Sequence, residues 1–165
     1  MFEIRKKDFL NKKDKSRKGS IDAGIIPIVN LLNSSSSYYT TSSCAGRIML
    51  LKIPHSGKKH ETEWLFVKHG IVELSEINVI LSNIPDGNLW FRQEGAILHV
   101  CCKTMQSAEK LLSVARDVSF KRSGIIAKGK RIIVEILGTE KLDAPIAKNG
   151  KLLVCLLYTS PSPRD

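Results

Sequence analysis

Short β-forming runs separated by polar turns fill the middle of this 165-residue chain, and they limit its fold more than any other feature. Branched and aromatic residues gather in runs of five to seven, and each run stops at glycine, proline, asparagine or a charged loop. Runs of this length and composition are typical of strands. We expect strands at Tyr38–Ser43, Arg47–Ile53, Trp64–His69, Leu89–Gln93 and Ile97–Cys102.

Helical spacing of apolar residues is confined to a few segments that flank these strands. The strongest is the segment after Thr104, a good N-cap, where apolar residues from Met105 to Val118 share one face. Further helices are expected over residues 2–13, over Ile21–Leu32 after a cap at Ser20 or Asp22, and from Ser75 to Leu81.

A hairpin is expected from Phe120–Ala127 and Arg131–Leu137, and another strand from Gly150. The mixture predicts an α/β (α+β mixed) fold, with one domain built on a mixed sheet and flanking helices.

Several classes of site have no motif here. No GxGxxG or GxxxxGK[ST] pattern occurs, so the sheet is expected to be non-Rossmann and to lack a P-loop. The four cysteines form no CxxC pair and the four histidines lack ligand spacing, so no metal site is predicted. No apolar run reaches 18 residues, which excludes a helical membrane span. Without a signal-peptide pattern, a cytoplasmic location is expected.

Positive charge is concentrated in two segments. Residues 1–20 hold eight basic and three acidic side chains, and residues 116–131 hold six basic and one acidic, within a chain of net charge +10. If the two segments meet in the fold, they form one surface for a polyanion such as nucleic acid. The alternative is two separate, solvated lysine-rich surfaces.

Three polar clusters are candidates for a site. Segment 14–22 lies where a loop enters a predicted helix, which suits an anion or is simply a capped helix start. Segment 40–47 joins hydroxyl side chains to Gly46 and Arg47, which suits a small charged ligand or forms a polar turn. The third cluster is His99, in an apolar strand, with segment 120–124; His99 can equally be a buried histidine with satisfied hydrogen bonds.

Taken together and in this order, the clusters resemble those of the tRNA wybutosine-synthesizing protein 3 family. The segment from Val134 to Leu153 follows the family pattern through Glu135, Gly138, Pro145 and Gly150. The resemblance covers residues 1 to about 154, and its other matching segments are Asp14–Asp22, Tyr39–Ile48, Ile97–Val100, Ala108–Arg116 and Phe120–Ile125.

The resemblance implies an S-adenosylmethionine-dependent tRNA N-methyltransferase. Its substrate would be 7-(3-amino-3-carboxypropyl)-4-demethylwyosine at position 37 of tRNA-Phe, methylated at N4 in wybutosine biosynthesis. The implied partner is the anticodon loop of tRNA-Phe, with neither DNA nor a membrane involved.

Residue roles follow as expectations from the same resemblance. Asp22 and His99 are expected to be catalytic, as the base or in positioning the substrate. Arg47 is expected to pair with the carboxylate of the cofactor. The full cofactor-binding set is Ser42, Ser43, Cys44, Gly46, Arg47, Ser123 and Gly124, and the tRNA-binding set is Ser16, Lys18, Lys121 and Arg122.

The sequence departs from the family pattern at a few positions. Ala45 and Ala96 replace a usual serine and proline, and Ser119 replaces a usual glycine that would suit a left-handed helix cap. The domain is expected over 1–154, without a further helix that the family has at its end. Segment 155–165 changes composition abruptly, resembles translated sequencing-adapter sequence, and is given no functional role.

Two other functions are compatible with these residues. The first is a noncatalytic RNA-binding module that uses only the basic segments. The second is a small-molecule hydrolase with Cys44 as nucleophile and a histidine as base, for which no third orienting group is found.

Overall fold

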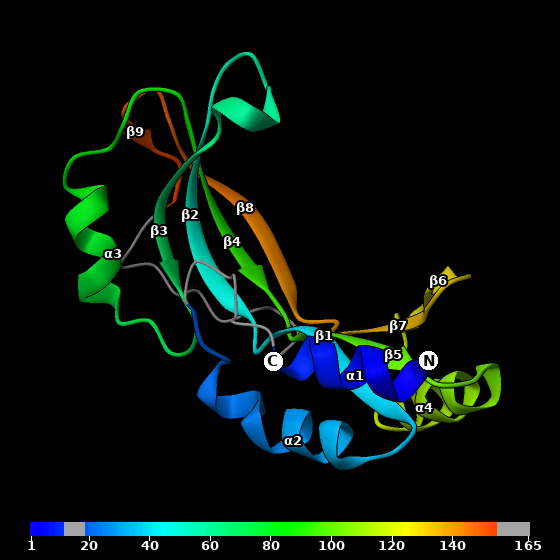
Figure 1. Ribbon diagram of the computed structural model, residues 1–165. Helices are drawn as coiled ribbons and strands as arrows, with labels where there is room; N and C mark the ends of the chain where they lie inside the picture. The colour runs from blue at the N-terminus through cyan, green and yellow to red at the C-terminus, as the bar shows by residue number, and fades with distance from the viewer. Residues whose placement is uncertain (12–18, 155–165) are drawn as a thin grey trace. The chain divides into compact units, whose positions relative to one another are not determined.

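The computed structural model describes residues 1–11 and 19–154, and Figure 1 labels the helices and strands that they form. Segments 12–18 and 155–165 lie outside the described residues, and so do the expectations for Ser16, Lys18 and the C-terminal segment. The elements are α1 (Phe2–Leu10), η1 (Ala23–Ile25), α2 (Ile26–Ser34), β1 (Tyr38–Cys44), β2 (Arg47–Ile53), η2 (Lys59–Glu61), β3 (Glu63–Lys68), α3 (Leu74–Leu81), β4 (Asn88–Glu94), β5 (Ile97–Cys102), α4 (Met105–Asp117), β6 (Gly124–Lys128), β7 (Ile132–Leu137), β8 (Lys141–Lys148) and β9 (Lys151–Leu152).

The strands divide between two sheets, and each sheet forms its own compact unit. The first unit combines Met1–Arg47 with Gln93–Lys141 and holds a four-stranded sheet in the order β1-β5-β7-β6. The second combines Ile48–Arg92 with Leu142–Asp165 and holds a five-stranded sheet in the order β3-β2-β4-β8-β9. The expected α+β, non-Rossmann fold is confirmed. The expectation of one mixed sheet is wrong, because the strands form two sheets and those of the first pair only antiparallel. One domain over 1–154 stays a prediction.

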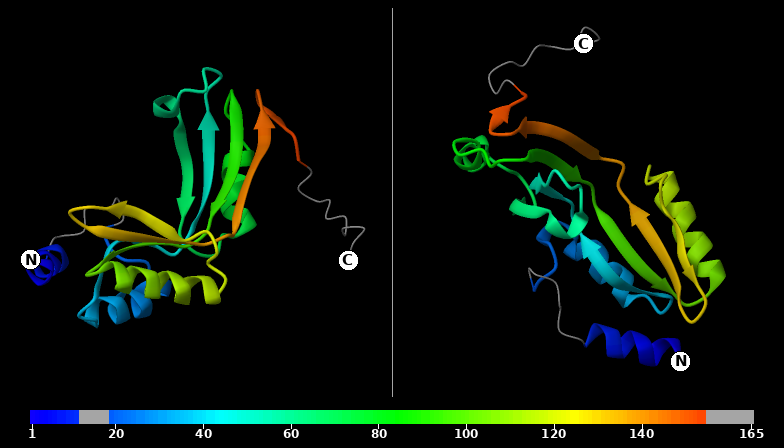
Figure 2. Two further views of the ribbon diagram at one scale, coloured as in Figure 1. Left: turned by 90° about the vertical axis from the view of Figure 1, so that its right-hand side faces the viewer. Right: turned by 90° about the horizontal axis from the view of Figure 1, so that it is seen from above.

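In the first unit, all three strand pairs are antiparallel, and one face of the sheet carries the main core. Side chains alternate between faces along a strand, so Leu98, Val100 and Cys102 of β5 point to the same side. This face packs against α2 and α4, which Figure 2 shows lying together on one side of the sheet. The helices contribute their buried residues Val29, Leu32, Ala108 and Leu112.

The opposite face of the same sheet is partly covered by α1. Tyr39, Cys101 and Ile133 are register neighbours on β1, β5 and β7, and they form a second cluster with Phe2 and Phe9. The rings of Phe2 and Phe9 lie 5.3 and 5.7 Å from the Tyr39 ring, which anchors α1 at this end of the sheet.

The second unit buries a separate core between its sheet and α3. Leu50, Leu89 and Ala147 come from the central strands, and Leu81 comes from the end of α3. The helix begins two residues earlier than the Ser75 cap predicts, because Glu73 is the N-cap and forms a capping box with Glu76.

Most predicted elements are present, with small shifts at their ends. Thr104 caps α4 as expected, and its hydroxyl accepts a hydrogen bond from the Ser107 N–H. The predicted hairpin forms, although β6 starts at Gly124 rather than at Phe120. Strand β8 was missed because Pro145 and two lysines weaken its β pattern. Within the described ranges, no helix is long and apolar enough to cross a membrane.

Candidate functional site

The loop that follows β1 in the first unit brings two of the predicted clusters together, at a place that we call the corner. Asp22 is the N-cap residue of η1, but its side chain makes no capping hydrogen bond. Instead, the Ala45 backbone N–H donates to Asp22 Oδ2 at 2.8 Å, and the aspartate is only 5% exposed. The loop 45–46 is therefore fixed by a buried carboxylate that comes from far along the chain.

Cys44, at the end of β1, shares this corner with Asp22. Burial raises the pKa of the Cys44 thiol, and the charge of the Asp22 carboxylate raises it further, while a backbone hydrogen bond from Gly46 and the charge of Arg47 lower it. The thiol is thus held in its protonated form near neutral pH. A protonated thiol is a poor nucleophile, which counts against a hydrolase that uses Cys44.

Gly46 and Arg47 complete the corner against the end of β4. Gly46 has φ of +100°, and a Cβ at this position would lie 2.7 Å from the Glu94 carbonyl oxygen. Arg47 Nε donates a hydrogen bond to Glu94 Oε2 at 2.8 Å, and Nη2 of the same guanidinium forms an ion pair with that oxygen at 2.7 Å. Only glycine permits this close approach, and Glu94 fixes the orientation of the arginine.

A row of side chains crosses the first sheet beside this corner. Ser42, His99 and Glu135 are successive register partners on β1, β5 and β7, and Gly124 on β6 is the partner of Glu135. His99 Nε2 and Glu135 Oε2 are 2.9 Å apart, and both side chains are between a quarter and a third exposed. The histidine is therefore neither a core residue nor a free surface group, and its ring is oriented by a carboxylate.

The row and the corner are neighbours, because β1 carries Ser42 in one and Cys44 in the other. Two residues of strand correspond to about 7 Å. Ser43 lies between them but pairs with Leu98, so it belongs to the face that packs on the helices. The structure thus brings Asp22, Cys44, Gly46 and Arg47 together, places Ser42 and His99 next to them, and sets Ser43 apart.

The remaining predicted residues lie on the loop from α4 to β6. Ser123 is buried, and its Oγ accepts a hydrogen bond from the Leu137 N–H at 3.3 Å. Lys121 and Arg122 are exposed. Ser123 therefore holds the loop against β7, and the two cations stay accessible to a ligand.

Two acidic residues at the site, Glu94 and Glu135, are absent from the predicted site set. Glu135 is a single carboxylate that interrupts an apolar strand, which was the available signal in the sequence. Glu94 ends β4 after Arg92 and Gln93 and gives no such signal. Their partners Arg47 and His99 become visible only once the strand register is known.

Comparisons with known proteins show which family the chain is similar to. The sequence profile described as "Methyltransferase TYW3" matches residues 4–159, which includes five residues of the segment from 155 onward. A Pyrococcus furiosus protein named tRNA(Phe) 7-((3-amino-3-carboxypropyl)-4-demethylwyosine(37)-N(4))-methyltransferase 1 is 40% identical over 155 residues, covering 93% of this chain and 79% of the relative. The bovine tRNA wybutosine-synthesizing protein 3 homolog is 38% identical, over 95% of this chain and 62% of its own length.

Solved structures give the same result at the level of the fold. A Pyrococcus horikoshii protein superposes with a TM-score of 0.82 at 39% identity, over 93% of this chain and 80% of that one. A hypothetical protein from Aeropyrum pernix reaches a TM-score of 0.70 at 31% identity, over 81% of this chain and 79% of that one. The chain belongs to the TYW3 methyltransferase family.

Proposed function

We propose that this chain transfers the methyl group of S-adenosylmethionine to N4 of 7-(3-amino-3-carboxypropyl)-4-demethylwyosine at position 37 of tRNA-Phe. The observation that carries the proposal is the 40% identity, over 93% of the chain, to a relative named for this reaction. The new N–CH₃ bond forms as the S–CH₃ bond breaks, the sulfur keeps the electron pair, and the nitrogen loses a proton to a base.

The residues of the corner fit the chemical groups of S-adenosylmethionine. That molecule carries a positive sulfonium, a carboxylate, an amino group and ribose hydroxyls. The buried Asp22 carboxylate favours positive charge, and the Arg47 guanidinium favours a carboxylate, while Gly46 lets the loop pack closely against Glu94. When bound, the cofactor supplies an electrophilic methyl group. Asp22, Cys44, Gly46 and Arg47 would hold it, and Ser42 would offer a hydroxyl from the adjacent row.

We assign His99 as the acceptor of the proton that leaves the substrate nitrogen. Its Nε2 lies 2.9 Å from Glu135, and its position in the partly exposed row leaves it accessible from solvent. The Asp22 carboxylate already accepts the Ala45 N–H, so its role is to organise the corner and to attract positive charge. Glu135 is a positioning residue, because it acts on the substrate only through the histidine.

For the tRNA, we propose Lys121 and Arg122 as contacts to backbone phosphates near the anticodon loop. Both are exposed on the loop that Ser123 fixes against β7. Two further roles stay predictions. One is tRNA binding by Ser16 and Lys18, which lie outside the described residues, and the other is cofactor binding by Ser123 and Gly124. The same holds for a cytoplasmic location.

The direct test is mass spectrometry of nucleosides from precursor-bearing tRNA-Phe after incubation with the protein and S-adenosylmethionine. A gain of one methyl group on the wyosine-type base is the expected result. Calorimetry with S-adenosylmethionine alone separates the two classes of function, because a noncatalytic RNA-binding module binds the tRNA but not the cofactor. No cofactor binding and no methyl gain would overturn the proposal.

Variants then test the assigned roles. His99→Ala should lower the single-turnover rate by about 10²–10⁴ without weakening cofactor binding, as removal of a general base does. Glu135→Gln keeps a hydrogen-bonding group beside the ring and should give a smaller loss. Arg47→Ala should weaken cofactor binding instead. A near-normal rate in His99→Ala would reject the base, and unchanged cofactor affinity in Arg47→Ala would reject the carboxylate contact.

A further inference from the structure

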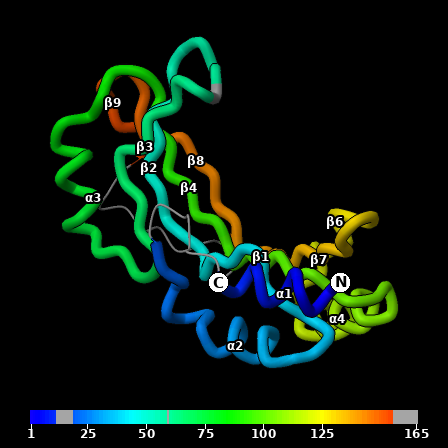
Figure 3. The backbone as a smooth tube through the Cα atoms, viewed as in Figure 1, coloured from blue at the N-terminus to red at the C-terminus, as the bar shows by residue number. Residues whose placement is uncertain are grey.

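The two basic segments of the sequence meet at one end of the first sheet. Arg5 of α1 donates a hydrogen bond through Nη1 to the carbonyl of Lys130, 125 residues away in the β6–β7 turn. Figure 3 shows α1 and this hairpin at the same end of the unit. The two basic segments therefore meet here, for the part of residues 1–20 that the structure describes.

A cavity of about 150 Å³ lies where α1, β5 and the turn come together. We name it the α1–hairpin pocket. Its lining includes Arg5, Tyr39, Lys103, Lys130 and Arg131, and Gly129 lies in the turn beside them. A side chain at Gly129 would meet no atom within 4 Å, so the backbone of the turn is open to solvent. A phosphate group can reach both the cations and the peptide groups of such a turn.

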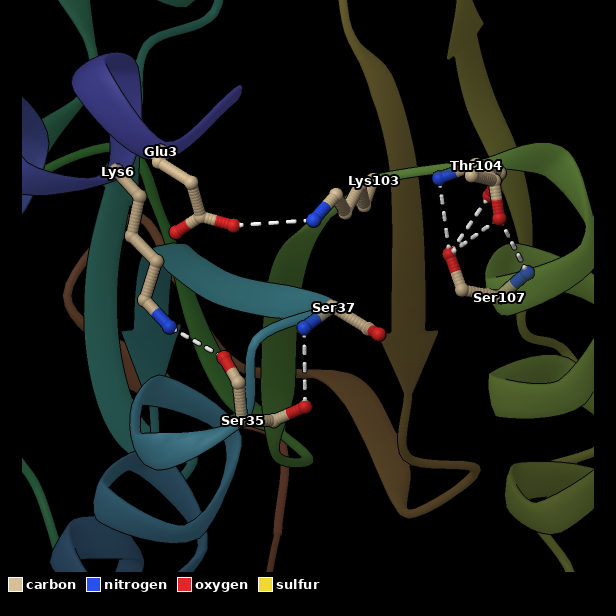
Figure 4. Close-up of polar contacts among 7 residues, drawn as sticks. All are labelled: Glu3, Lys6, Ser35, Ser37, Lys103, Thr104 and Ser107. Atoms are coloured by element: carbon tan, nitrogen blue, oxygen red, sulfur yellow. Dashed lines mark hydrogen bonds and ion pairs between the residues drawn. The ribbon is translucent and has the colours of Figure 1, made fainter. Parts of the chain in front are cut away.

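The α1–hairpin pocket has more cationic side chains than carboxylates that form ion pairs with them. The carboxylate of Glu3 lies 3.2 Å from Lys103 Nζ, as Figure 4 shows. Over residues 1–11 and 19–154, no carboxylate forms an ion pair with Arg5, Lys130 or Arg131. Three cations around one cavity without an acidic partner attract an anionic ligand.

The pocket is rigid on its helical side, so its cations are preorganised. Phe2 and Phe9 hold α1 on Tyr39, and Lys6 donates to the Ser35 carbonyl (Figure 4). The Arg5 side chain is fixed in turn by its bond to the Lys130 carbonyl. Binding then needs little loss of side-chain entropy, which favours affinity for a phosphate.

The pocket and the corner lie at opposite ends of the same strand pair. Tyr39 pairs with Cys101 at the pocket, and Cys44 pairs with Ile97 at the corner. Four or five residues of strand separate the two ends, which is about 13–17 Å. A stacked nucleic-acid strand covers this distance in about four or five nucleotides of ~3.4 Å each.

We infer that the α1–hairpin pocket binds a backbone phosphate of the RNA substrate, several nucleotides away from the base that reaches the His99 row. The inference rests on the proposed function for the identity of the RNA. This phosphate contact would be additional to those of Lys121 and Arg122, because the pocket lies at the other end of β6. These two residues precede β6, and Lys130 and Arg131 follow it, so the hairpin edge carries cations at both ends.

The test is binding of a fluorescent tRNA-Phe transcript, followed by anisotropy at several salt concentrations without S-adenosylmethionine. The variant Lys130→Ala with Arg131→Ala should weaken binding about tenfold or more at ~0.1 M salt. The slope of log K against log salt should fall by about 0.7–0.9, which is the contribution of one phosphate contact.

The matched control is Lys148→Ala with Lys151→Ala, which removes two exposed charges from the second unit. It should change affinity less than about twofold. Equal losses in both pairs would mean that net charge alone governs binding, and this would overturn the inference. Lys130→Ala alone, which touches Arg5 only through its backbone, repeats the test without disturbing the Arg131 side chain beside Tyr39.

Methyl transfer at saturating RNA distinguishes this inference from the proposed function. We expect the pocket variant to keep its single-turnover rate and to need more tRNA to reach it. If the unaltered protein methylates the tRNA and the pocket variant binds it equally well, the inference is wrong and the proposed function stands. If the unaltered protein binds but never methylates, and the pocket variant still loses binding, the inference stands and the catalytic proposal fails.

Discussion

Replacing Ser119 with glycine should stabilise the first unit, because α4 ends in a conformation that suits glycine. Ser119 has φ of +74°, in the left-handed region. Its N–H donates to the Arg116 carbonyl at 3.0 Å, and the Phe120 N–H donates to the Ala115 carbonyl at 2.9 Å. These two bonds define a Schellman motif with Ser119 at C′, the position where glycine is most common.

The size of the effect follows from two opposing terms. A left-handed conformation costs an L-residue about 1–2 kcal/mol. Glycine removes that cost, but its extra freedom in the unfolded chain takes back about 0.5–1 kcal/mol. Ser119 is exposed, so the substitution loses little packing. We expect a net gain of about 0.5–1 kcal/mol, which corresponds to roughly 1–4 °C in Tm for a chain of this length.

Urea titration followed by far-UV circular dichroism measures this gain as a higher midpoint with an unchanged slope. Ser113→Gly is the matched control, since Ser113 is an exposed residue inside α4. The same chemical change should there destabilise by about 0.5 kcal/mol, because glycine is a poor helix former. A lower midpoint for Ser119→Gly, similar to that of Ser113→Gly, would refute the reasoning from the positive φ.

Three further predictions concern the site and the core. Gly46→Ala should destabilise the protein by about 2–4 kcal/mol and weaken cofactor binding, because the new Cβ would lie 2.7 Å from the Glu94 carbonyl oxygen at a φ of +100°. Thermal unfolding measures the stability and calorimetry measures the binding. Normal values in both assays would contradict this prediction. Burial raises the pKa of Cys102 to about 12 from its ordinary 9.0. As the pH rises, the unfolded chain therefore releases this proton before the folded protein does. The free energy of unfolding should fall between about pH 9 and pH 12. Urea titrations should show that the free energy of unfolding falls by about 1 kcal/mol between pH 9 and pH 10 in the unaltered protein, and that Cys102→Ala does not show this fall. The same pH dependence in both proteins would exclude the role of Cys102. Thr104→Ala should lower the free energy of unfolding by about 1 kcal/mol, because it removes the acceptor of the Ser107 N–H, whereas Thr104→Ser should be nearly neutral. Equal unfolding midpoints for the two variants would show that the cap contributes nothing.

The candidate site illustrates how far the sequence leads. The residues Asp22, Cys44, Gly46, Arg47 and His99 were all predicted, and the structure brings them to one end of one sheet. Their partners were not predicted. Glu94 orients Arg47, and Glu135 orients His99, and each partner is identified only by strand pairing.

The sequence by itself determined the local structure of this protein. Alternation and turn residues placed most strands, and Thr104 marked the start of α4, because these signals act within a few residues. Tertiary structure decided everything that depends on register between distant segments. It divided the strands between two sheets, and it joined His99 to Glu135 across 36 residues and Arg5 to Lys130 across 125. The physical reason is that a strand's pattern fixes which side chains share a face, while its partner and register are selected by packing of the whole sheet.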